Sequence, residues 1–242
     1  MLLSPQGQNR NNKHGFYNAR VSLENNKWIL SLAMDVQEEK PKLNYYVGVD
    51  LGVKTLATIS CNGEKSTILN INKSKEVKRL EKRLRREQRQ AARRIKKSSN
   101  QIKAYKQINK TYTRLRNIRR NHNHKATFKI ISMLPLAIGI EDLNISGMLK
   151  NKHLAKAIQD CSFYEILRQL EYKAAFKGIK IIKADRFYPS TKRCSRCGHI
   201  HGSLTLKDRT YKCNKCNLTI DRDFNASLNL EKLASTLSLQ GN

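Results

Sequence analysis

The sequence predicts a mixed α/β domain that carries two insertions, a long basic helical hairpin and a small metal-bound ribbon. Strand-like and helix-like segments alternate through most of the 242 residues, which is the order that builds a mixed sheet covered by helices. Residues 73–125 hold 21 Lys and Arg against three Glu. Near the end of the chain, four cysteines form two CxxC pairs. At this length, one main domain with a small appendage is expected.

The first strands are predicted in "FYNARVSLENNKWILSLAMDV", which holds two apolar runs around the turn "ENNK". The next segment, "YYVGVDLGVKTLATISCNGEKSTILNI", holds three strand-like runs, and the last two are joined at Asn62-Gly63. This dipeptide favours a type I′ hairpin turn because both residues take positive φ. We therefore expect a three-stranded meander whose first strand ends in Asp50.

Residues 73–125 are predicted to form two long antiparallel helices. Apolar residues recur at helical spacing on each side of the break "KKSSN", first as Val77, Leu80, Leu84, Ala91 and Ile95, then as Ile102, Tyr105, Tyr112, Leu115 and Ile118. A solvated hairpin is the alternative interpretation. Because few acids are interleaved to form i,i+4 pairs, we favour a nucleic-acid-binding face. Its candidate residues are Lys78, Arg79, Lys82, Arg83, Arg85, Arg86, Arg89, Arg93, Arg94, Arg114, Arg116, Arg119 and Arg120.

The segments after the hairpin complete the alternation. A helix through "TFKIISML" ends at Pro135, and "LAIGIEDL" is a buried strand whose end brings Glu141. After a polar loop, Ser162 is expected to cap a helix from Phe163 to about Lys177, which stops at Gly178. "IKIIKADR" is a further strand, and "FNASLNLEKLAS" is a helical stretch.

The four paired cysteines predict a structural zinc site. Cys194, Cys197, Cys213 and Cys216 form two CxxC pairs separated by fifteen residues, the spacing of a closed tetrahedral zinc ribbon. Four buried free thiols are the alternative, but they would leave nothing to hold a loop too polar to form its own core. Cys61 and Cys161 stand alone, so a disulfide framework is a poor explanation. A reducing, cytoplasmic location is expected.

Three acids are candidates for a catalytic metal site. Asp50 and Glu141 each end an apolar run, and Asp223 opens the last helical stretch. Acids at these places lie where the sheet meets solvent, and a divalent cation would offset their repulsion. Three carboxylates holding two Mg²⁺ ions, about 3.5–4 Å apart, activate a water for phosphodiester displacement. Alternatively, Asp223 or Asp221 caps a helix, Asp50 closes a turn, and Glu141 is a surface residue.

The composition supports a polyanionic partner. With 48 Lys and Arg against 19 Asp and Glu, the formal net charge is +29 and the pI is about 10.1, which favours nucleic acid. A membrane surface is the weaker candidate, because the sequence has no apolar run of about 18 residues and no signal segment at its amino terminus.

Four segments together resemble the TnpB (OrfB) family, insertion-sequence proteins similar to the RuvC nuclease part of type V CRISPR effectors. They are "VGVDLGVKTLAT", "IGIEDLNISGM", "YPSTKRCSRCG" and "YKCNKCNLTIDRDFNASLNL", in that order. The resemblance implies an RNase H-like (RuvC) fold with catalytic acids at Asp50, Glu141 and Asp223, and with Mg²⁺, or Mn²⁺ in its place, as the catalytic ion. Asp223 is preferred over Asp221 as the third ligand because it directly precedes the helix, which leaves Asp221 as an outer neighbour of the metal site.

The resemblance also implies a domain plan and partners. Residues 44–72 and 126–242 would form the nuclease domain, with the hairpin of residues 73–125 and the zinc ribbon of residues 190–219 inserted. Residues 1–43 would be a remnant of a wedge-like β region. The implied function is a transposon-encoded, RNA-guided DNA endonuclease whose partners are guide RNA and target DNA. A catalytically inactive nucleic-acid-binding remnant or repressor is the alternative, and no feature favours joining of DNA ends.

Overall fold

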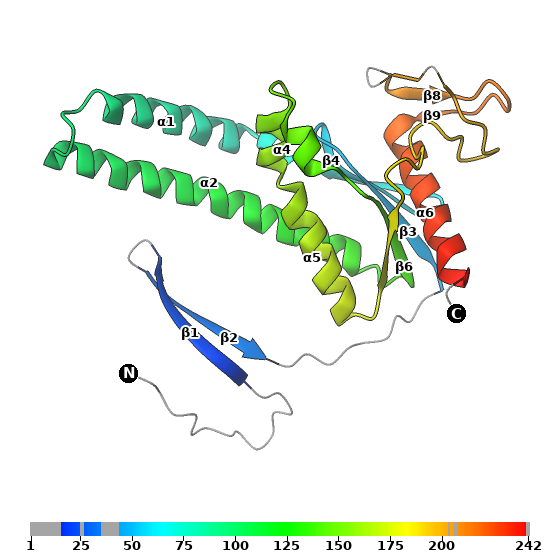
Figure 1. The fold of residues 1–242 in the computed structure, drawn as a ribbon, viewed down its shortest axis with the longest axis horizontal. Coiled ribbons are helices and arrows are strands. Elements are labelled where there is room, and N and C mark those ends of the chain that lie inside the picture. The colour runs from blue at the N-terminus through cyan, green and yellow to red at the C-terminus, as the bar shows by residue number, and fades with distance from the viewer. Residues whose placement is uncertain (1–15, 25–26, 35–43, 203, 206–207, 241–242) are drawn as a thin grey trace. The chain divides into compact units, whose positions relative to one another are not determined.

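The computed structural model describes residues 16–24, 27–34, 44–202, 204–205 and 208–240 (Figure 1). The chain divides into two compact units, residues 1–38 and 39–242, and each is treated by itself. No helix among the described residues is both long and apolar enough to cross a membrane.

The described part of the first unit is a two-stranded antiparallel sheet of β1 (Phe16–Glu24) and β2 (Lys27–Met34). The register runs from Glu24 opposite Lys27 to Phe16 opposite Met34. Both expected strands are therefore confirmed. Their turn at residues 25–26, and the rest of the region expected to be a wedge-like remnant, residues 1–15 and 35–43, lie outside the described residues.

The second unit is built on a five-stranded mixed sheet of order β5-β4-β3-β6-β7. The pairs β5-β4 and β4-β3 are antiparallel, while β3-β6 and β6-β7 are parallel. At the β4-β5 turn, Asn62 and Gly63 have φ of 51° and 77°, as the type I′ turn requires. This is the RNase H-like sheet that the resemblance implied. Its strands are β3 (Tyr46–Leu51), β4 (Thr55–Cys61), β5 (Glu64–Leu69), β6 (Ala137–Glu141) and β7 (Lys180–Ala184).

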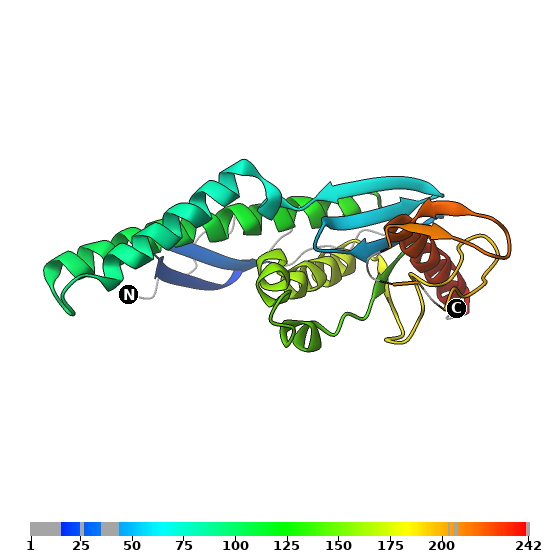
Figure 2. The ribbon, with the colours of Figure 1, turned by 90° about the horizontal axis from the view of Figure 1, so that it is seen from above.

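The basic insertion is a hairpin of two antiparallel helices, α1 (Lys75–Ala92) and α2 (Ser99–Ile131), after a short 3-10 turn, η1 (Ile71–Lys73). Figures 1 and 2 show both helices extending beyond the sheet. Ser74 and Ser98 cap them by accepting hydrogen bonds from backbone N–H groups three residues on. α2 continues past residue 125, so the expected boundary between hairpin and nuclease domain falls inside one helix.

The apolar seam of the hairpin is shorter than the sequence predicts. Val77, Leu80 and Leu115 are buried together at the root. Of the expected members toward the tip, however, Ile95, Ile102, Tyr105 and Tyr112 are all at least half exposed. There the helices meet through polar side chains, such as Gln107, which donates to Glu87 at 3.4 Å. Ala91 is buried as expected, at 1% exposed, so the seam continues toward the tip through this small residue and not through the larger apolar side chains.

Helices cover both faces of the sheet. One face packs on α5 (Phe163–Phe176) and the end of α2, with a core that includes Val47, Val49, Ile138 and Ile140. The opposite face packs on α6 (Arg222–Gln240). The segment expected to be a polar loop contains two short helices, α3 (Ile145–Leu149) and α4 (Ala155–Cys161).

The prediction that the Ser162 side chain caps α5 is wrong. Ser162 occupies the N-cap position but makes no side-chain cap hydrogen bond. Its backbone is left-handed, with φ of 55°, because the same residue ends α4 and starts α5. Its hydroxyl donates instead to the carbonyl of Gln159 at 3.2 Å. Gly178, with φ of 61°, lies just beyond the end of α5, as expected.

Candidate functional site

The position of α6 is set by two glycines in neighbouring strands. A Cβ added at Gly48 would lie 1.9 Å from the carbonyl oxygen of Ser227, and one at Gly139 would lie 2.1 Å from that of Leu230. The α6 backbone therefore rests directly on β3 and β6. Because side chains two residues apart share a face of a sheet, Asp50 and Glu141 point to the side that α6 covers.

The three predicted acids come to one edge of the sheet. Val49 pairs with Ile140 in parallel register, so Asp50 and Glu141 follow side by side on adjacent strands. Asp223 lies in the first turn of α6. Asp50 is only 9% exposed, and burial, then the charge of Glu141, then that of Asp223 raise the pKa of its carboxyl well above the ordinary value.

The carboxylates are held by different partners. Glu141 accepts a hydrogen bond from Ser190 Oγ. Asp223 Oδ1 accepts from Arg222 Nη2 at 2.9 Å, and Arg222 lowers the pKa of Asp50, against the larger effect of burial. The Asp50 carboxylate makes no hydrogen bond or ion pair with any residue that the structure describes.

The acids share an edge without meeting at one point. In the described part of the chain, only the four paired cysteines form a group of three or more His, Cys, Asp or Glu with ligand atoms all within 4.8 Å of one another. The expectation that Asp50, Glu141 and Asp223 hold metal ions therefore stays a prediction.

Asp221 has a structural role that the sequence left open. Its Oδ1 accepts a hydrogen bond from the Phe224 N–H at 2.9 Å, which caps the start of α6. The same oxygen lies 3.1 Å from Lys65 Nζ. Asp221 thus ties the first turn of α6 to β5, next to Asp223.

Sequence reasoning missed the polar residues that support Glu141. Ser190 and Asn229 are 3% and 2% exposed. Asn229 Nδ2 donates to the carbonyl of Ser190 at 2.8 Å and to that of Arg193 at 2.6 Å. Asn225, one turn earlier in α6, also donates to the carbonyl of Arg193, at 2.7 Å. The signal that could have found them is a pair of asparagines four residues apart on an otherwise apolar helix face.

The four cysteines form a compact cluster between the end of β7 and α6. Their sulfur atoms approach in pairs, Cys194 to Cys216 at 3.6 Å and Cys197 to Cys213 at 3.5 Å. A zinc ion with four sulfur ligands at 2.3 Å needs sulfur separations of about 3.8 Å, so the cluster fits such an ion. Two short antiparallel strands, β8 (Thr210–Lys212) and β9 (Thr219–Asp221), support it.

The predicted nucleic-acid-binding residues lie along the hairpin, and nearly all of them are exposed. The exception is Arg119, which is about one-sixth exposed and bonds to Glu81 at 2.8 Å and Asp160 at 3.0 Å. It also donates to Asn72 at 2.8 Å. The Arg119 guanidinium therefore joins the hairpin root to α4. The other residues are exposed, although Arg83 pairs with Glu87 at 2.7 Å and Arg114 with Glu76 at 3.0 Å.

Two family models match the chain. OrfB_IS605, described as "Probable transposase", matches residues 29–152. The Cas12f1-like TNB domain matches residues 163–230.

Relatives and solved structures agree with these matches. A protein of Streptomyces pristinaespiralis named "Putative RNA-guided DNA endonuclease" is 35% identical over 205 residues, covering 84% of this chain and 49% of that protein. The "CRISPR-associated endodeoxyribonuclease Cas12f1" of Sulfoacidibacillus thermotolerans is 26% identical, over 85% of this chain and 50% of that protein. A CRISPR-Cas12f ternary complex solved by cryo-EM aligns with a TM-score of 0.61 at 22% identity, over 84% of this chain and 42% of the other. That likeness supports the fold. The chain spans about half the length of these curated relatives.

Proposed function

We propose that this chain, which belongs to the OrfB_IS605 family of probable transposases, is a transposon-encoded, metal-dependent, RNA-guided DNA endonuclease. The observation that carries the proposal is the buried Asp50 carboxylate, whose pKa is raised by burial and by the neighbouring Glu141 and Asp223. Buried carboxylates without a cationic partner are costly. Asp50 is such a carboxylate, and two further acids, Glu141 and Asp223, raise its pKa from the same edge of the sheet, which indicates a site built for a divalent cation.

Asp50, Glu141 and Asp223 would hold Mg²⁺, or Mn²⁺ in its place, because carboxylate oxygens are the ligands that these hard cations prefer. When bound, the ions supply an activated water and stabilise the charge that develops during phosphodiester hydrolysis. The chain's own residues keep the acids in position. Ser190 orients Glu141 by its hydrogen bond, and Arg222 offsets the charge of Asp223.

The four cysteines are proposed to hold a structural Zn²⁺. Four thiolates close a tetrahedral shell and leave no position for substrate. The site lies in the ribbon, residues 190–219, and serves to fold a polar segment that has only a small core around Tyr211. Thiols at metal-ligand spacing persist in a reducing compartment, so a cytoplasmic location is part of the proposal.

The partners are proposed to be a guide RNA and a target DNA. The hairpin of residues 73–125 supplies the basic face for them, with Lys78, Arg79, Lys82, Arg83, Arg85, Arg86, Arg89, Arg93, Arg94, Arg114, Arg116 and Arg120 exposed along it. The nuclease domain then comprises residues 44–72 and 126–242. Binding through such a surface depends steeply on salt, because each phosphate contact releases a counterion.

A second candidate is a nucleic-acid-binding protein of the same family without catalysis, such as a repressor. It is favoured by one observation, that the three carboxylates do not form a compact ligand group among the described residues. This candidate predicts tight, salt-dependent binding and no magnesium-dependent cutting.

The deciding experiment compares Asp50→Asn with Asp142→Asn. Asp142 neighbours Glu141 in sequence, but its side chain is 45% exposed and its nearest cation, Arg186, lies 3.6 Å away. The protein is purified with its bound RNA, the RNA is sequenced, and matched DNA is added with Mg²⁺. Asp50→Asn should lower the cleavage rate by about a thousandfold or more, with RNA binding retained, and Asp142→Asn should cut normally. Cleavage by Asp50→Asn at the parent rate excludes Asp50 as a catalytic residue.

A further inference from the structure

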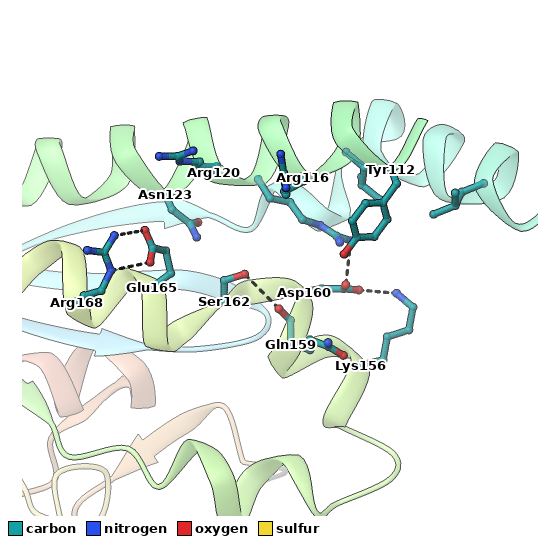
Figure 3. Close-up of a pocket in the computed structure, with 13 residues that line it drawn as sticks. Tyr112, Arg116, Arg120, Asn123, Lys156, Gln159, Asp160, Ser162, Glu165 and Arg168 are labelled. Atoms are coloured by element: carbon teal, nitrogen blue, oxygen red, sulfur yellow. Dashed lines mark hydrogen bonds and ion pairs between the residues drawn. The ribbon is translucent and has the colours of Figure 1, made fainter. Parts of the chain in front are cut away.

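A cavity of about 720 Å³ lies where α2 faces α4 and α5, away from the three acids. Figure 3 shows it between the α2 helix and the two shorter helices. Its volume falls within the range of about 300–1,000 Å³ that is typical of ligand sites. The cavity belongs to neither the carboxylate edge nor the cysteine ribbon, so its lining requires a separate explanation.

The acids of the cavity are already neutralised by protein partners. Asp160 pairs with Arg119 at 3.0 Å and also with Lys156. Glu165 accepts two hydrogen bonds from Arg168, each 2.9 Å long, and Figure 3 shows this paired contact. These acids are therefore not available to bind a cation, and they do not cancel the remaining positive charge.

Arg120 supplies that remaining charge. It lines the cavity, its side chain is exposed, and it forms no ion pair with any residue in the described part of the chain. Arg116 lines the same wall, one helical turn earlier. The cavity therefore attracts an anionic group.

A buried amide gives independent support for an occupant. Asn123 is only 4% exposed, yet its side-chain amide makes no hydrogen bond with the residues that the structure describes. It lines the cavity, and in Figure 3 it points from α2 toward α5. Buried polar groups are nearly always hydrogen-bonded, and the Asn123 amide is not among the buried side-chain atoms that lack any access to a partner, so water in the cavity or an occupant that displaces it supplies the hydrogen bonds.

The opposite end of the cavity carries apolar groups beside the Asp160 ion pairs. Leu84, Leu115 and the ring of Tyr112 line it. From Tyr112 to Asn123 the wall formed by α2 is about 16 Å long, at 1.5 Å per residue. An elongated site with a cation and an amide at one end and an aromatic ring at the other suits a strand that has both phosphates and bases.

We propose that this cavity binds an unpaired segment of a nucleic-acid strand, with a phosphate at Arg120 and a polar edge of a base or sugar at the Asn123 amide. Unpaired bases are recognised in proteins by stacking on aromatic rings and by hydrogen bonds to their edges, and Tyr112 offers the ring. This inference rests on the proposed action on nucleic acid but not on cleavage. RNA and DNA strands share this chemistry, and the test separates them.

The test compares Asn123→Ala with Asn121→Ala, an exposed asparagine on the same helix. Fluorescence anisotropy measures binding of short single-stranded RNA and DNA to the full chain, without added Mg²⁺, so that no cleavage interferes. Asn123→Ala should weaken binding by about threefold to tenfold, the range of one hydrogen bond, with an unchanged salt dependence. Asn121→Ala should bind like the parent protein. An effect on RNA alone assigns the cavity to an RNA strand, and an effect on DNA alone assigns it to DNA.

A second pair of variants tests the phosphate contact. Arg120→Gln and Arg93→Gln each remove one exposed charge, but Arg93 follows α1 near the hairpin tip, outside the cavity. Arg120→Gln should lower the affinity more than Arg93→Gln and reduce the salt slope by about one unit. If the parent protein binds both strands while Asn123→Ala and Arg120→Gln match their controls, the cavity is not a nucleic-acid site, although the proposed function stands. If the parent protein binds neither strand, both proposals fail.

Discussion

Ser190 Oγ donates a hydrogen bond to the Glu141 carboxylate, which joins the segment leading into the cysteine ribbon to the end of β6. The backbone of the same segment is held by Asn229 of α6, through the carbonyls of Ser190 and Arg193. Arg193 directly precedes Cys194. The orientation of Glu141 therefore depends on the ribbon and on α6 as well as on its own strand.

Ser190→Ala should weaken cleavage by about ten- to a hundredfold, the usual effect of removing a group that orients a metal ligand. The specific readout is a higher Mg²⁺ concentration for half-maximal cleavage, because the freed Glu141 carboxylate binds metal less well. Thr191→Ala is the matched control, since the Thr191 hydroxyl makes no hydrogen bond with the described residues. An unchanged Mg²⁺ requirement in Ser190→Ala contradicts the positioning role.

Cys216→Ser should remove the proposed zinc ion, whereas Cys61→Ser should keep it, because Cys61 lies at the end of β4 rather than in the cluster. Elemental analysis by mass spectrometry gives the zinc content of each variant. Hydrogen exchange should rise across residues 190–219 in Cys216→Ser and stay low in the sheet, which has its own core. Parent protein without bound zinc, or equal exchange in both variants, would refute the structural site.

Gly48→Ala should destabilise the protein by about 1–3 kcal/mol or more, the cost of overpacking a close contact. The added Cβ would lie 1.9 Å from the Ser227 carbonyl oxygen and 2.5 Å from the Glu231 nitrogen. Both are backbone atoms, so α6 has to shift and carry Asp223 with it. Urea unfolding measures the loss, and Gly202→Ala, where no atom lies within 4 Å of the added Cβ, is the control. Equal stability of the two variants argues against the close packing of α6 on β3.

Local patterns were sufficient to predict most of the elements. The apolar runs on either side of Asn62-Gly63 predicted the meander. Asp50 and Glu141 each end an apolar run and Asp223 opens a helical stretch, and these positions predicted that the three acids lie at one edge of the sheet. The extent of the hairpin seam could not be predicted in the same way. Helical spacing predicts that Ile95 and Tyr105 belong to the apolar seam of the hairpin. Whether another surface packs against them depends on tertiary structure, which the spacing does not show.

The supporting contacts of the site could not be predicted from local sequence. Ser190 meets Glu141 across 49 positions, and this contact arises only when the ribbon folds back on the sheet. The sequence allowed a helix cap at either Asp221 or Asp223, and the start of α6 decides between them. The structure assigns the cap to Asp221, whose Oδ1 accepts a hydrogen bond from the Phe224 N–H. Residue spacing marks Asn225 and Asn229 as a pair on α6, but it does not show that Ser190 is the residue that reaches Glu141.

Arg119→Gln should lower the free energy of unfolding by about 1–3 kcal/mol, between the values for exposed and fully buried ion pairs. The change leaves Glu81 and Asp160 without this cation, and both side chains are at most one-fifth exposed. Arg114→Gln removes the same charge from an exposed pair with Glu76 and should cost much less. Thermal or urea unfolding compares them. If Arg119→Gln is as stable as Arg114→Gln, the guanidinium does not hold the hairpin root.

Glu165→Gln should show a pH-dependent loss of stability. Hydrogen bonds from Arg168 lower the pKa of Glu165 from 4.5 to about 2, so the folded state binds this proton less readily than the unfolded chain. The charged carboxylate therefore stabilises the fold fully above about pH 4.5, and its contribution is lost as the pH falls toward about 2. Urea unfolding at several pH values should show the largest difference between parent and Glu165→Gln near neutrality and a smaller one in acid. Glu171→Gln, which removes the same charge from an exposed pair with Lys183, corrects for the change in net charge. A difference that stays constant after this correction, from neutral to acid pH, shows that the pairing of Glu165 with Arg168 does not stabilise the folded protein.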